Sequence, residues 1–376
     1  MIYLDHAATT RPSAEAVTAV NQALCLHWGN PSSLYDFGMQ AENVLEDARR
    51  RAACLLGCDR REIYFTSGGT EANVLAVLGA AAAGKRRGKR IVTSAIEHAS
   101  VKDSIDQLEK EGFEVVRLRP GADGNFDPAE IGNAVTADTV LVSLMLINNE
   151  TGICLPVRAA ADAIRRTGAP ALLHCDAVQA FGKIPISVKA LGVDLLTASS
   201  HKIHGPKGCG LLYKSAEARI VPRTFGGAQE RGLRPGTEPV PAVAGFGAAM
   251  ANLDIAGSMA AVKSLNDWLR AAVKKAGYIL HSPENASDYI LNFSVPGYRS
   301  ETLLHALESA GIYVSSGSAC AKGQKSHVLQ AMGLPDREIG SALRVSLAPE
   351  NTIEELEQLM QELHRCTQNL KASEVK

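Results

Sequence analysis

The chain has 376 residues, of which 46% are hydrophobic and 21% charged, and its formal net charge is −1 at pH 7. A chain of this length can bury a large core and is expected to divide into two domains. The near-zero charge gives no reason to expect nucleic acid as a partner, since that would call for a clustered basic face. No secretory leader and no membrane span is expected, because the opening stretch turns polar by its fifth residue and no later window is apolar for long enough.

The eight cysteines form no CxxC pair and no dense framework, and no histidine-rich motif accompanies them. Neither a disulfide scaffold nor a metal site is therefore expected. Several of the cysteines lie in apolar helix or strand patterns, which is typical of small core residues. A reducing cytoplasm is the location that this cysteine usage favours.

From about residue 60, short β-rich runs alternate with longer helical patterns. This alternation predicts an α/β fold with a mostly parallel central sheet flanked by helices. The run over residues 139–147 is nearly all apolar, as in a strand that is buried on both faces. The predicted strands span residues 62–68, 90–96, 114–120, 138–152, 171–179, 193–202 and 208–214, and the predicted helices span residues 70–84, 101–112 and 157–168.

After about residue 258 the pattern changes, because helices at 262–277 and 301–311 now mix with short strands at 289–295 and 342–348. This mixture predicts a smaller α+β domain. We expect residues 14–258 to form the large α/β domain, and residues 1–13 with 259–376 to form the small one. The Gly- and Ser-rich stretch over about 315–326 is expected to be an exposed loop of the small domain.

Polar residues follow five of the predicted strands, at the point where each strand ends. Ligands of a parallel sheet bind beyond the carboxyl ends of its strands, which meet at one edge. Each polar group alone could belong to an ordinary turn or helix cap, but their convergence on one edge favours a binding site. The residues concerned are Gly69 and Thr70, His98, Asn148 to Glu150, Asp176 and Gln179, and Ser199, His201 and Lys202.

The chemistry of these residues suits an aldehyde cofactor. A lysine used as a nucleophile must be kept neutral or tied up as a Schiff base, and Lys202 lies in an unusual setting between His201 and His204. Pyridoxal phosphate needs such a lysine, an anion site for its phosphate and an acidic partner for its ring nitrogen. The turn at Gly68 and Gly69 and the helix start at Thr70 would form the anion site.

The remaining strand-end residues fit around the same cofactor. Asp176 would pair with the ring nitrogen and keep the ring a good electron sink. His98 could lie flat on the ring, and Gln179 could donate to its phenolic oxygen. Ser199 and His201 would be neighbours of the phosphate or the ring. Lys202 is therefore interpreted as the residue that holds the cofactor.

With these motifs assembled, the chain resembles the cysteine desulfurases of the NifS/IscS type, which are class V members of the fold-type I pyridoxal-phosphate enzymes. The likeness runs nearly end to end and keeps the order of the motifs. It is carried by YLDHAATT, NPSS, FTSGGTEAN, IEHASV, NNETG, HCDAVQAFGK, SSHKIHGPKGCG, GGAQERGLRPGTE, SSGSAC and LRVSL.

The resemblance implies roles at matching positions. Lys202 would carry the cofactor, His98 would stack on the ring, Asp176 would pair with the ring nitrogen, and Gln179 would reach the phenolic oxygen. Arg344 would bind the substrate carboxylate through its bidentate fork. The other implied contacts are Asn149 to the substrate carboxylate and the cofactor, and Gly69, Thr70, Ser199 and His201 to the phosphate.

Two further implications concern residues away from the strand ends. Thr237 would reach the phosphate in a neighbouring subunit, which makes the enzyme an obligate homodimer with shared sites. Cys320 would accept sulfur from L-cysteine as a persulfide. Small residues around Cys320 would let its loop swing, and the nearby Lys322 favours the thiolate.

The sulfur acceptor remains open at this point. The loop after Cys320 is shorter than in many relatives that serve iron–sulfur assembly, so an iron–sulfur scaffold and an enzyme of tRNA or cofactor thiolation are both compatible with it. Three other functions also stay open: a class V aminotransferase, a selenocysteine lyase, and a scaffold protein that keeps the fold without catalysis. Retention of Lys202, Asp176, Cys320 and Arg344 argues against the scaffold.

Overall fold

The computed structural model describes residues 1–121, 123–316 and 325–369. The predicted sulfur acceptor Cys320 and its neighbour Lys322 lie outside the described residues.

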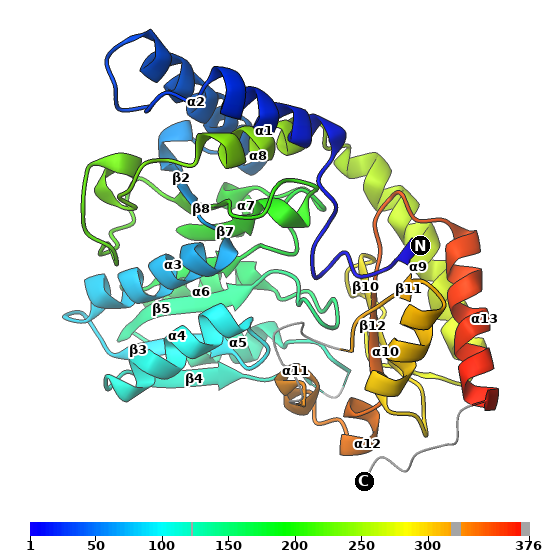
Figure 1. Cartoon of the computed structure of the whole chain (residues 1–376). Coiled ribbons are helices and arrows are strands. Elements are labelled where there is room, and N and C mark those ends of the chain that lie inside the picture. The colour runs from blue at the N-terminus through cyan, green and yellow to red at the C-terminus, as the bar shows by residue number, and fades with distance from the viewer. Residues whose placement is uncertain (122, 317–324, 370–376) are drawn as a thin grey trace.

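A mixed, mostly parallel sheet forms the centre of the larger part of the molecule (Figure 1). Within the described ranges it has seven strands, and β8 is antiparallel to both of its neighbours while the others are mutually parallel. In spatial order the strands are β2 (Ile63–Thr66), β8 (Gly210–Lys214), β7 (Leu195–Ser199), β6 (Leu172–Asp176), β5 (Thr139–Met145), β3 (Arg90–Ser94) and β4 (Glu114–Leu118).

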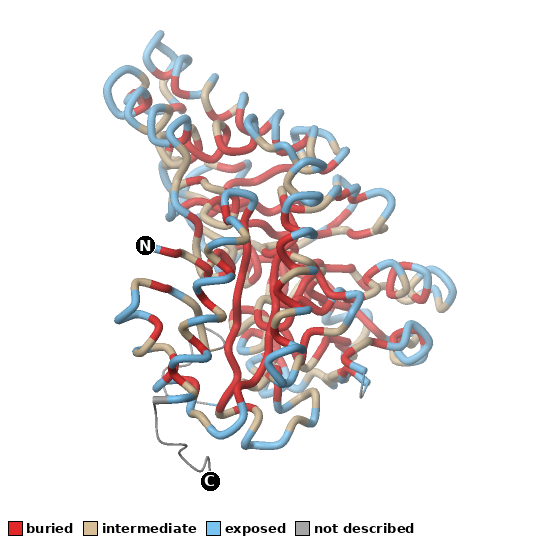
Figure 2. The backbone as a smooth tube through the Cα atoms, turned by 90° about the vertical axis from the view of Figure 1, so that its right-hand side faces the viewer, coloured by how far each residue is buried: buried red, intermediate tan, exposed pale blue. Residues whose placement is uncertain are grey.

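Both faces of this sheet are covered, which explains its apolar strands. Alternate residues point to opposite faces, so Leu195 of β7 packs in one core cluster and Leu196 in another. Helices α3 (Gly69–Gly84) and α4 (Ala99–Lys110) cover the face of Leu195. The other face is covered by α2 (Asp36–Leu56), α6 (Val157–Thr167) and α8 (Val240–Ala251). Figure 2 shows the buried backbone in the interior and the exposed segments around it.

Local signals set the helix ends. The Ser13 side chain accepts a hydrogen bond from the backbone N–H of Ala16 and so caps α1 (Ala14–Leu26). Gly168 ends α6 in the left-handed conformation. The shorter helices of this part are α5 (Pro128–Ala134), α7 (Val188–Leu191), η1 (Arg60–Glu62), η2 (Ser200–Lys202) and η3 (Gln229–Gly232).

The smaller part of the molecule has its own sheet. Strands β9 (Ile279–Leu280), β10 (Ile290–Ser294) and β12 (Ala342–Ser346) pair antiparallel, with β10 in the centre. The start of the chain joins this part, because β1 (Ile2–Tyr3) pairs in parallel with β11 (Ile312–Tyr313). Its helices are α9 (Ile255–Lys275), α10 (Ser300–Ser309), α11 (His327–Ala331), α12 (Asp336–Ile339) and α13 (Ile353–Asn369).

Every strand and helix that the sequence predicted is present, with bounds that differ by up to seven residues. The division at residues 13/14 and 258/259 stays a prediction; α9 begins at Ile255 and runs through the second of these positions. Within the described ranges, no single helix is both long and apolar enough to cross a membrane. Only α8 and α9 taken together, bent by 75° at their junction, meet that length and composition.

Candidate active site

A cavity of about 260 Å³ opens at the carboxyl ends of the parallel strands. Ten of the twelve predicted site residues line it, although they come from segments spread over most of the chain. They are Gly69, Thr70, His98, Asn149, Asp176, Gln179, Ser199, His201, Lys202 and Arg344. The convergence expected at one edge of the sheet is confirmed.

Backbone carbonyls from the start of the chain hold the Lys202 side chain. Its ammonium Nζ donates to the carbonyl oxygens of Ala7 at 2.6 Å and of Ala8 at 2.7 Å. The carbonyl of His201 in turn accepts from the backbone N–H of Thr10 at 2.9 Å, so the two segments are tied side by side. The amine of Lys202 is thus positioned at the wall of the cavity.

Asp176 and His98 share one supporting residue, Asn73. The Asn73 amide donates to Asp176 Oδ2 at 2.7 Å and to the hydroxyl of Ser100 at 2.9 Å. That hydroxyl lies 2.8 Å from His98 Nδ1, which also accepts from the backbone N–H of Ser100. Neutral His98 therefore carries its proton on Nε2. The other carboxylate oxygen of Asp176 accepts from the backbone N–H of Val178 at 2.9 Å.

The start of α3 meets the end of β7 at one side of the cavity. Gly69 is required there, because a Cβ atom at this position would lie 2.8 Å from Val178 Cγ2. The hydroxyl of Ser199 is buried without a hydrogen-bond partner among the described residues. His201 Nδ1 lies 3.1 Å from the hydroxyl of Thr9. Burial, followed by the positive charges of nearby lysines, lowers the pKa of His201 to about 4.

Gln179 is held from both sides. Its Nε2 donates to the Ala7 carbonyl at 2.9 Å, and its Oε1 accepts from Lys183 Nζ at 3.1 Å. The Ala7 carbonyl is the same oxygen that accepts from Lys202. A continuous chain of hydrogen bonds therefore leads from Lys183 through Gln179 and Ala7 to Lys202.

Arg344 of β12 brings a buried cation to the opposite wall. Its Nη1 donates to the Asn149 carbonyl at 2.8 Å, and its Nη2 pairs with Asp5 Oδ1 at 2.7 Å. The Nε atom of Arg344 has no partner among the described residues. A guanidinium held in this way still offers a donor to an incoming anion.

Two predicted site residues do not line the cavity. Thr237 is exposed in the segment between η3 and α8, and Cys320 lies outside the described residues. From Ser326 on, the described chain is anchored beside the site. The hydroxyl of Ser326 donates to the buried carboxylate of Glu150 at 2.5 Å, and His327 Nε2 lies 2.9 Å from the Glu97 carbonyl. In the same described ranges, no cluster of His, Cys, Asp and Glu is placed to hold a metal ion.

Known proteins share both the sequence and this architecture. The family model described as aminotransferase class V matches residues 2–359. The chain belongs to the class V aminotransferase family.

Individual members of the class V family extend the match. A cysteine desulfurase IscS from Methanosarcina thermophila is 39% identical, over 98% of this chain and 93% of its own length. A solved NifS-like protein superposes with a TM-score of 0.92 at 34% identity, covering 98% of this chain and 100% of that one. A structure of SspA in complex with cysteine gives a TM-score of 0.82 at 30% identity, covering 94% and 100%. The resemblance to NifS/IscS-type cysteine desulfurases and the fold-type I architecture are confirmed.

Several class V motifs contain site residues to which the sequence interpretation gave no role. Asn73 lies one helical turn after Thr70, and Lys183 lies four residues after Gln179, so each spacing placed the two side chains on one side of a turn. Asp5 precedes the Ala7 carbonyl in YLDHAATT, and nothing local to that motif points to its partner. These residues support the predicted ones rather than replace them.

Proposed function

We propose that this cysteine desulfurase converts L-cysteine to L-alanine and transfers the sulfur to Cys320 as a persulfide. The observation that carries the proposal is the lining of the 260 Å³ cavity by ten predicted residues of distinct chemistry. The solved SspA complex, whose fold this chain shares, contains cysteine. The net reaction is L-cysteine plus the Cys320 thiol giving L-alanine plus the Cys320 persulfide, so that atoms and electrons balance.

The residues present fit pyridoxal phosphate, on which this family depends. Lys202 would hold the cofactor covalently through Nζ, and Asp176 would face its ring nitrogen. The buried Ser199 hydroxyl has no hydrogen-bond partner among the described residues. This supports a phosphate site between Ser199 and the start of α3. Thr70 and His201 would complete that phosphate site. When bound, the cofactor supplies an electron sink for the substrate α-carbon.

Gln179 and His98 would contact the ring from two directions. The Gln179 amide is oriented by Lys183, whose ammonium donates to Oε1, and its Nε2 therefore faces acceptors. His98 is oriented by Ser100 in the same manner and presents Nε2–H. These orientations support a ring contact for His98 and a contact of Gln179 with the phenolic oxygen.

Arg344 and Asn149 would hold the substrate carboxylate. The guanidinium of Arg344 supports this role, because each Nη atom has one N–H left beyond its bond to Asn149 or Asp5. Lys202 Nζ would take the proton from the substrate α-carbon and later return a proton to form the product. The Nε2–H of His98 would donate a hydrogen bond to the substrate sulfur while the Cys320 thiolate attacks that sulfur.

A homodimer with shared sites is part of the proposal. Large apolar side chains are exposed on the chain between α1 and the start of α2, where the rings of Trp28 and Phe37 stack with centroids 5.4 Å apart. Phe225 is 86% exposed in the segment that leads toward Thr237. Exposed apolar surface of this extent supports a protein interface. Thr237 would then reach the phosphate site of a neighbouring copy.

The persulfide would pass to an acceptor protein of iron–sulfur cluster assembly or of tRNA or cofactor thiolation. Ser326, six residues after Cys320 in the sequence, is anchored on Glu150, which supports an acceptor docked near the active site.

The test is release of alanine and sulfide from L-cysteine in the presence of a thiol reductant. We expect alanine and sulfide in equal amounts from the intact protein and none from Cys320→Ala, while the exposed Cys25→Ala stays active. Full activity of Cys320→Ala, or transamination without sulfide, would overturn the proposal. Preference for selenocysteine over cysteine, measured as the ratio of kcat/KM, would instead indicate a selenocysteine lyase.

A further inference from the structure

A second cavity, of about 400 Å³, lies next to the active site and is larger than it. Lys202 lines both cavities. Gln179 lines the first and Lys183 the second, and the hydrogen bond between these two side chains joins the sites. A cavity of this size is within the range of small-molecule sites. None of the roles discussed above uses it.

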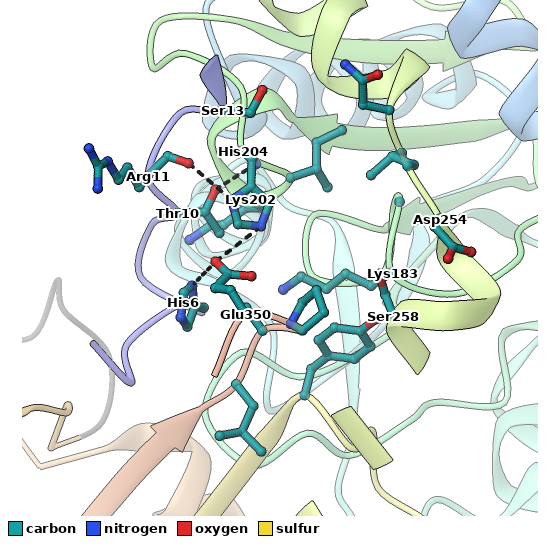
Figure 3. A pocket seen from close by; sticks show the side chains of 18 of the residues that line it. His6, Thr10, Arg11, Ser13, Lys183, Lys202, His204, Asp254, Ser258 and Glu350 are labelled. Atoms are coloured by element: carbon teal, nitrogen blue, oxygen red, sulfur yellow. Dashed lines mark hydrogen bonds and ion pairs between the residues drawn. The ribbon is translucent and has the colours of Figure 1, made fainter. Parts of the chain in front are cut away.

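The second cavity contains a buried cation without a counter-charge. Lys183 is 7% exposed, and Figure 3 shows its side chain extending into the cavity. Its ammonium contacts the Gln179 amide and lies 5.5 Å from the centre of the Tyr289 ring. In the described part of the chain no carboxylate lies within 4 Å of it. Burial and the charges of Lys202 and Arg344 lower the pKa of Lys183 to about 7.

An ammonium in these surroundings favours an anionic neighbour. Neutral partners and an aromatic ring compensate only part of the cost of burying a charge. The other basic side chain at the mouth does not compete for such an anion, since Figure 3 shows the Arg11 side chain turned away from the cavity. The positive charge of the cavity therefore comes from Lys183 and from Lys202, which lines both cavities.

His6 adds a second polar group to the same wall. It is 4% exposed, and neither ring nitrogen makes a hydrogen bond of good geometry with the described residues. Burial, followed by the charges of His204 and Lys183, lowers its pKa to about 4, and contacts with Tyr3 and Asn351 offset this only in part. Neutral His6 thus adds an uncharged ring to this wall of the cavity.

The acidic and apolar groups around the cavity limit the kind of anion. Glu350 lies at the mouth, 3.9 Å from His6 Nδ1 and 3.8 Å from His204 Nε2, and would repel a dianion (Figure 3). Asp254 is occupied in capping α9. The remaining walls are largely apolar and include Ile203, Leu253 and Leu347.

We propose that this cavity binds a small monocarboxylate, whose anionic group pairs with Lys183 and whose apolar body packs on Ile203, Leu253 and Leu347. The site is separate from the substrate site at Arg344, and the inference depends on the cavity rather than on the desulfurase reaction. Because Lys183 also donates to Gln179, a ligand in the second cavity would alter a hydrogen bond that orients an active-site residue. The proposal therefore predicts that a monocarboxylate binds in the second cavity and that its binding affects the active site.

Butyrate is a suitable probe, and butyramide, which has the same shape without the charge, is its control. Binding is measured by saturation-transfer NMR on the full-length, cofactor-loaded protein with L-alanine in excess to fill the substrate site. We expect saturable butyrate binding, with butyramide at least about tenfold weaker. Lys183→Met should weaken butyrate binding about tenfold or more, whereas the exposed Lys207→Met should leave it unchanged.

A second variant keeps the test decisive if Lys183→Met does not fold. Ser258 lies on the first turn of α9 and lines the cavity, so Ser258→Phe fills the space without changing any charge. It should weaken butyrate about tenfold. The proposal would be overturned if alanine displaced butyrate or if butyramide bound equally well. It would also be overturned if butyrate bound Ser258→Phe as tightly as the natural protein, or if it did not bind up to about 100 mM.

Discussion

Asp5, from the start of the chain, holds Arg344 of β12 through an ion pair of 2.7 Å between Oδ1 and Nη2. The arginine side chain is only 2% exposed, and the two residues are 339 positions apart. A neighbouring contact between Asp5 and Ser346 extends the small sheet and keeps the acid in register with β12. The guanidinium is therefore oriented by the Asp5 side chain and by the main-chain carbonyl of Asn149.

Asp5→Ala should leave the Arg344 guanidinium poorly oriented in the active site. Removal of one partner of a buried pair leaves the other charge uncompensated, so we expect a loss of about 3 kcal/mol in the free energy of unfolding. The KM for L-cysteine should rise about tenfold or more, with a smaller change in kcat. Asp5→Asn keeps an acceptor oxygen and should restore most of the KM. Unchanged KM in Asp5→Ala would contradict a positioning role.

Asn73→Leu should disturb cofactor binding without touching the cofactor. The change removes one hydrogen bond from each of three buried residues, Asp176, Ser100 and Thr197. Each such loss costs about 1–3 kcal/mol, so the free energy of unfolding should fall by several kcal/mol. Affinity for pyridoxal phosphate, measured by equilibrium dialysis, should fall about tenfold. Asn252→Leu, at an exposed position after α8, should change neither quantity.

The sequence predicted the strand-end residues well because one rule places them. Parallel strands deliver their carboxyl ends to one edge, so Asp176 and Lys202 could be assigned to a common site without a contact map. The ion pair of Asp5 with Arg344 and the antiparallel direction of β8 were not predicted. Both depend on how segments far apart in the sequence pair with each other, which a local hydrophobic pattern does not determine.

Glu97 should make stability depend on pH. Its carboxyl is fully buried, and burial raises its pKa from 4.5 to about 8, although hydrogen bonds from Ser94 and the Met145 backbone favour the charged form. A raised carboxyl pKa means that the folded state holds its proton more tightly than the unfolded state. The stabilisation is complete below pH 4.5 and is lost as the pH rises toward 8.

Glu97→Gln should remove this dependence. Urea unfolding at a series of pH values should show the stability of the variant, relative to the natural protein, increasing by several kcal/mol between pH 5 and 8 and constant above that. The exposed Glu357→Gln is the control and should follow the natural protein at each pH. Parallel curves for Glu97→Gln and the natural protein would show that Glu97 is charged when folded.

Arg49 of α2 should stabilise the segment that leads to Thr237. It forms a bidentate ion pair with the buried Glu230, with Nη1–Oε2 and Nη2–Oε1 distances of 2.9 and 3.0 Å. It also donates to the Ile63 carbonyl. Glu230 and Arg231 have φ angles of 44° and 55°, a left-handed conformation that non-glycine residues rarely adopt. The ion pair therefore holds a strained turn in place.

Arg49→Met should lower the free energy of unfolding by about 3–5 kcal/mol, because it leaves the Glu230 carboxylate buried without a counter-charge. Adding Glu230→Gln removes that charge and should recover a large part of the loss, which a double-mutant cycle in urea measures as a coupling energy. The cofactor-loaded Arg49→Met protein should also dissociate more readily into single chains, since the turn positions the segment that carries Thr237. Additive effects of the two changes, with unaltered dissociation, would mean that the pair stabilises neither the turn nor the proposed dimer.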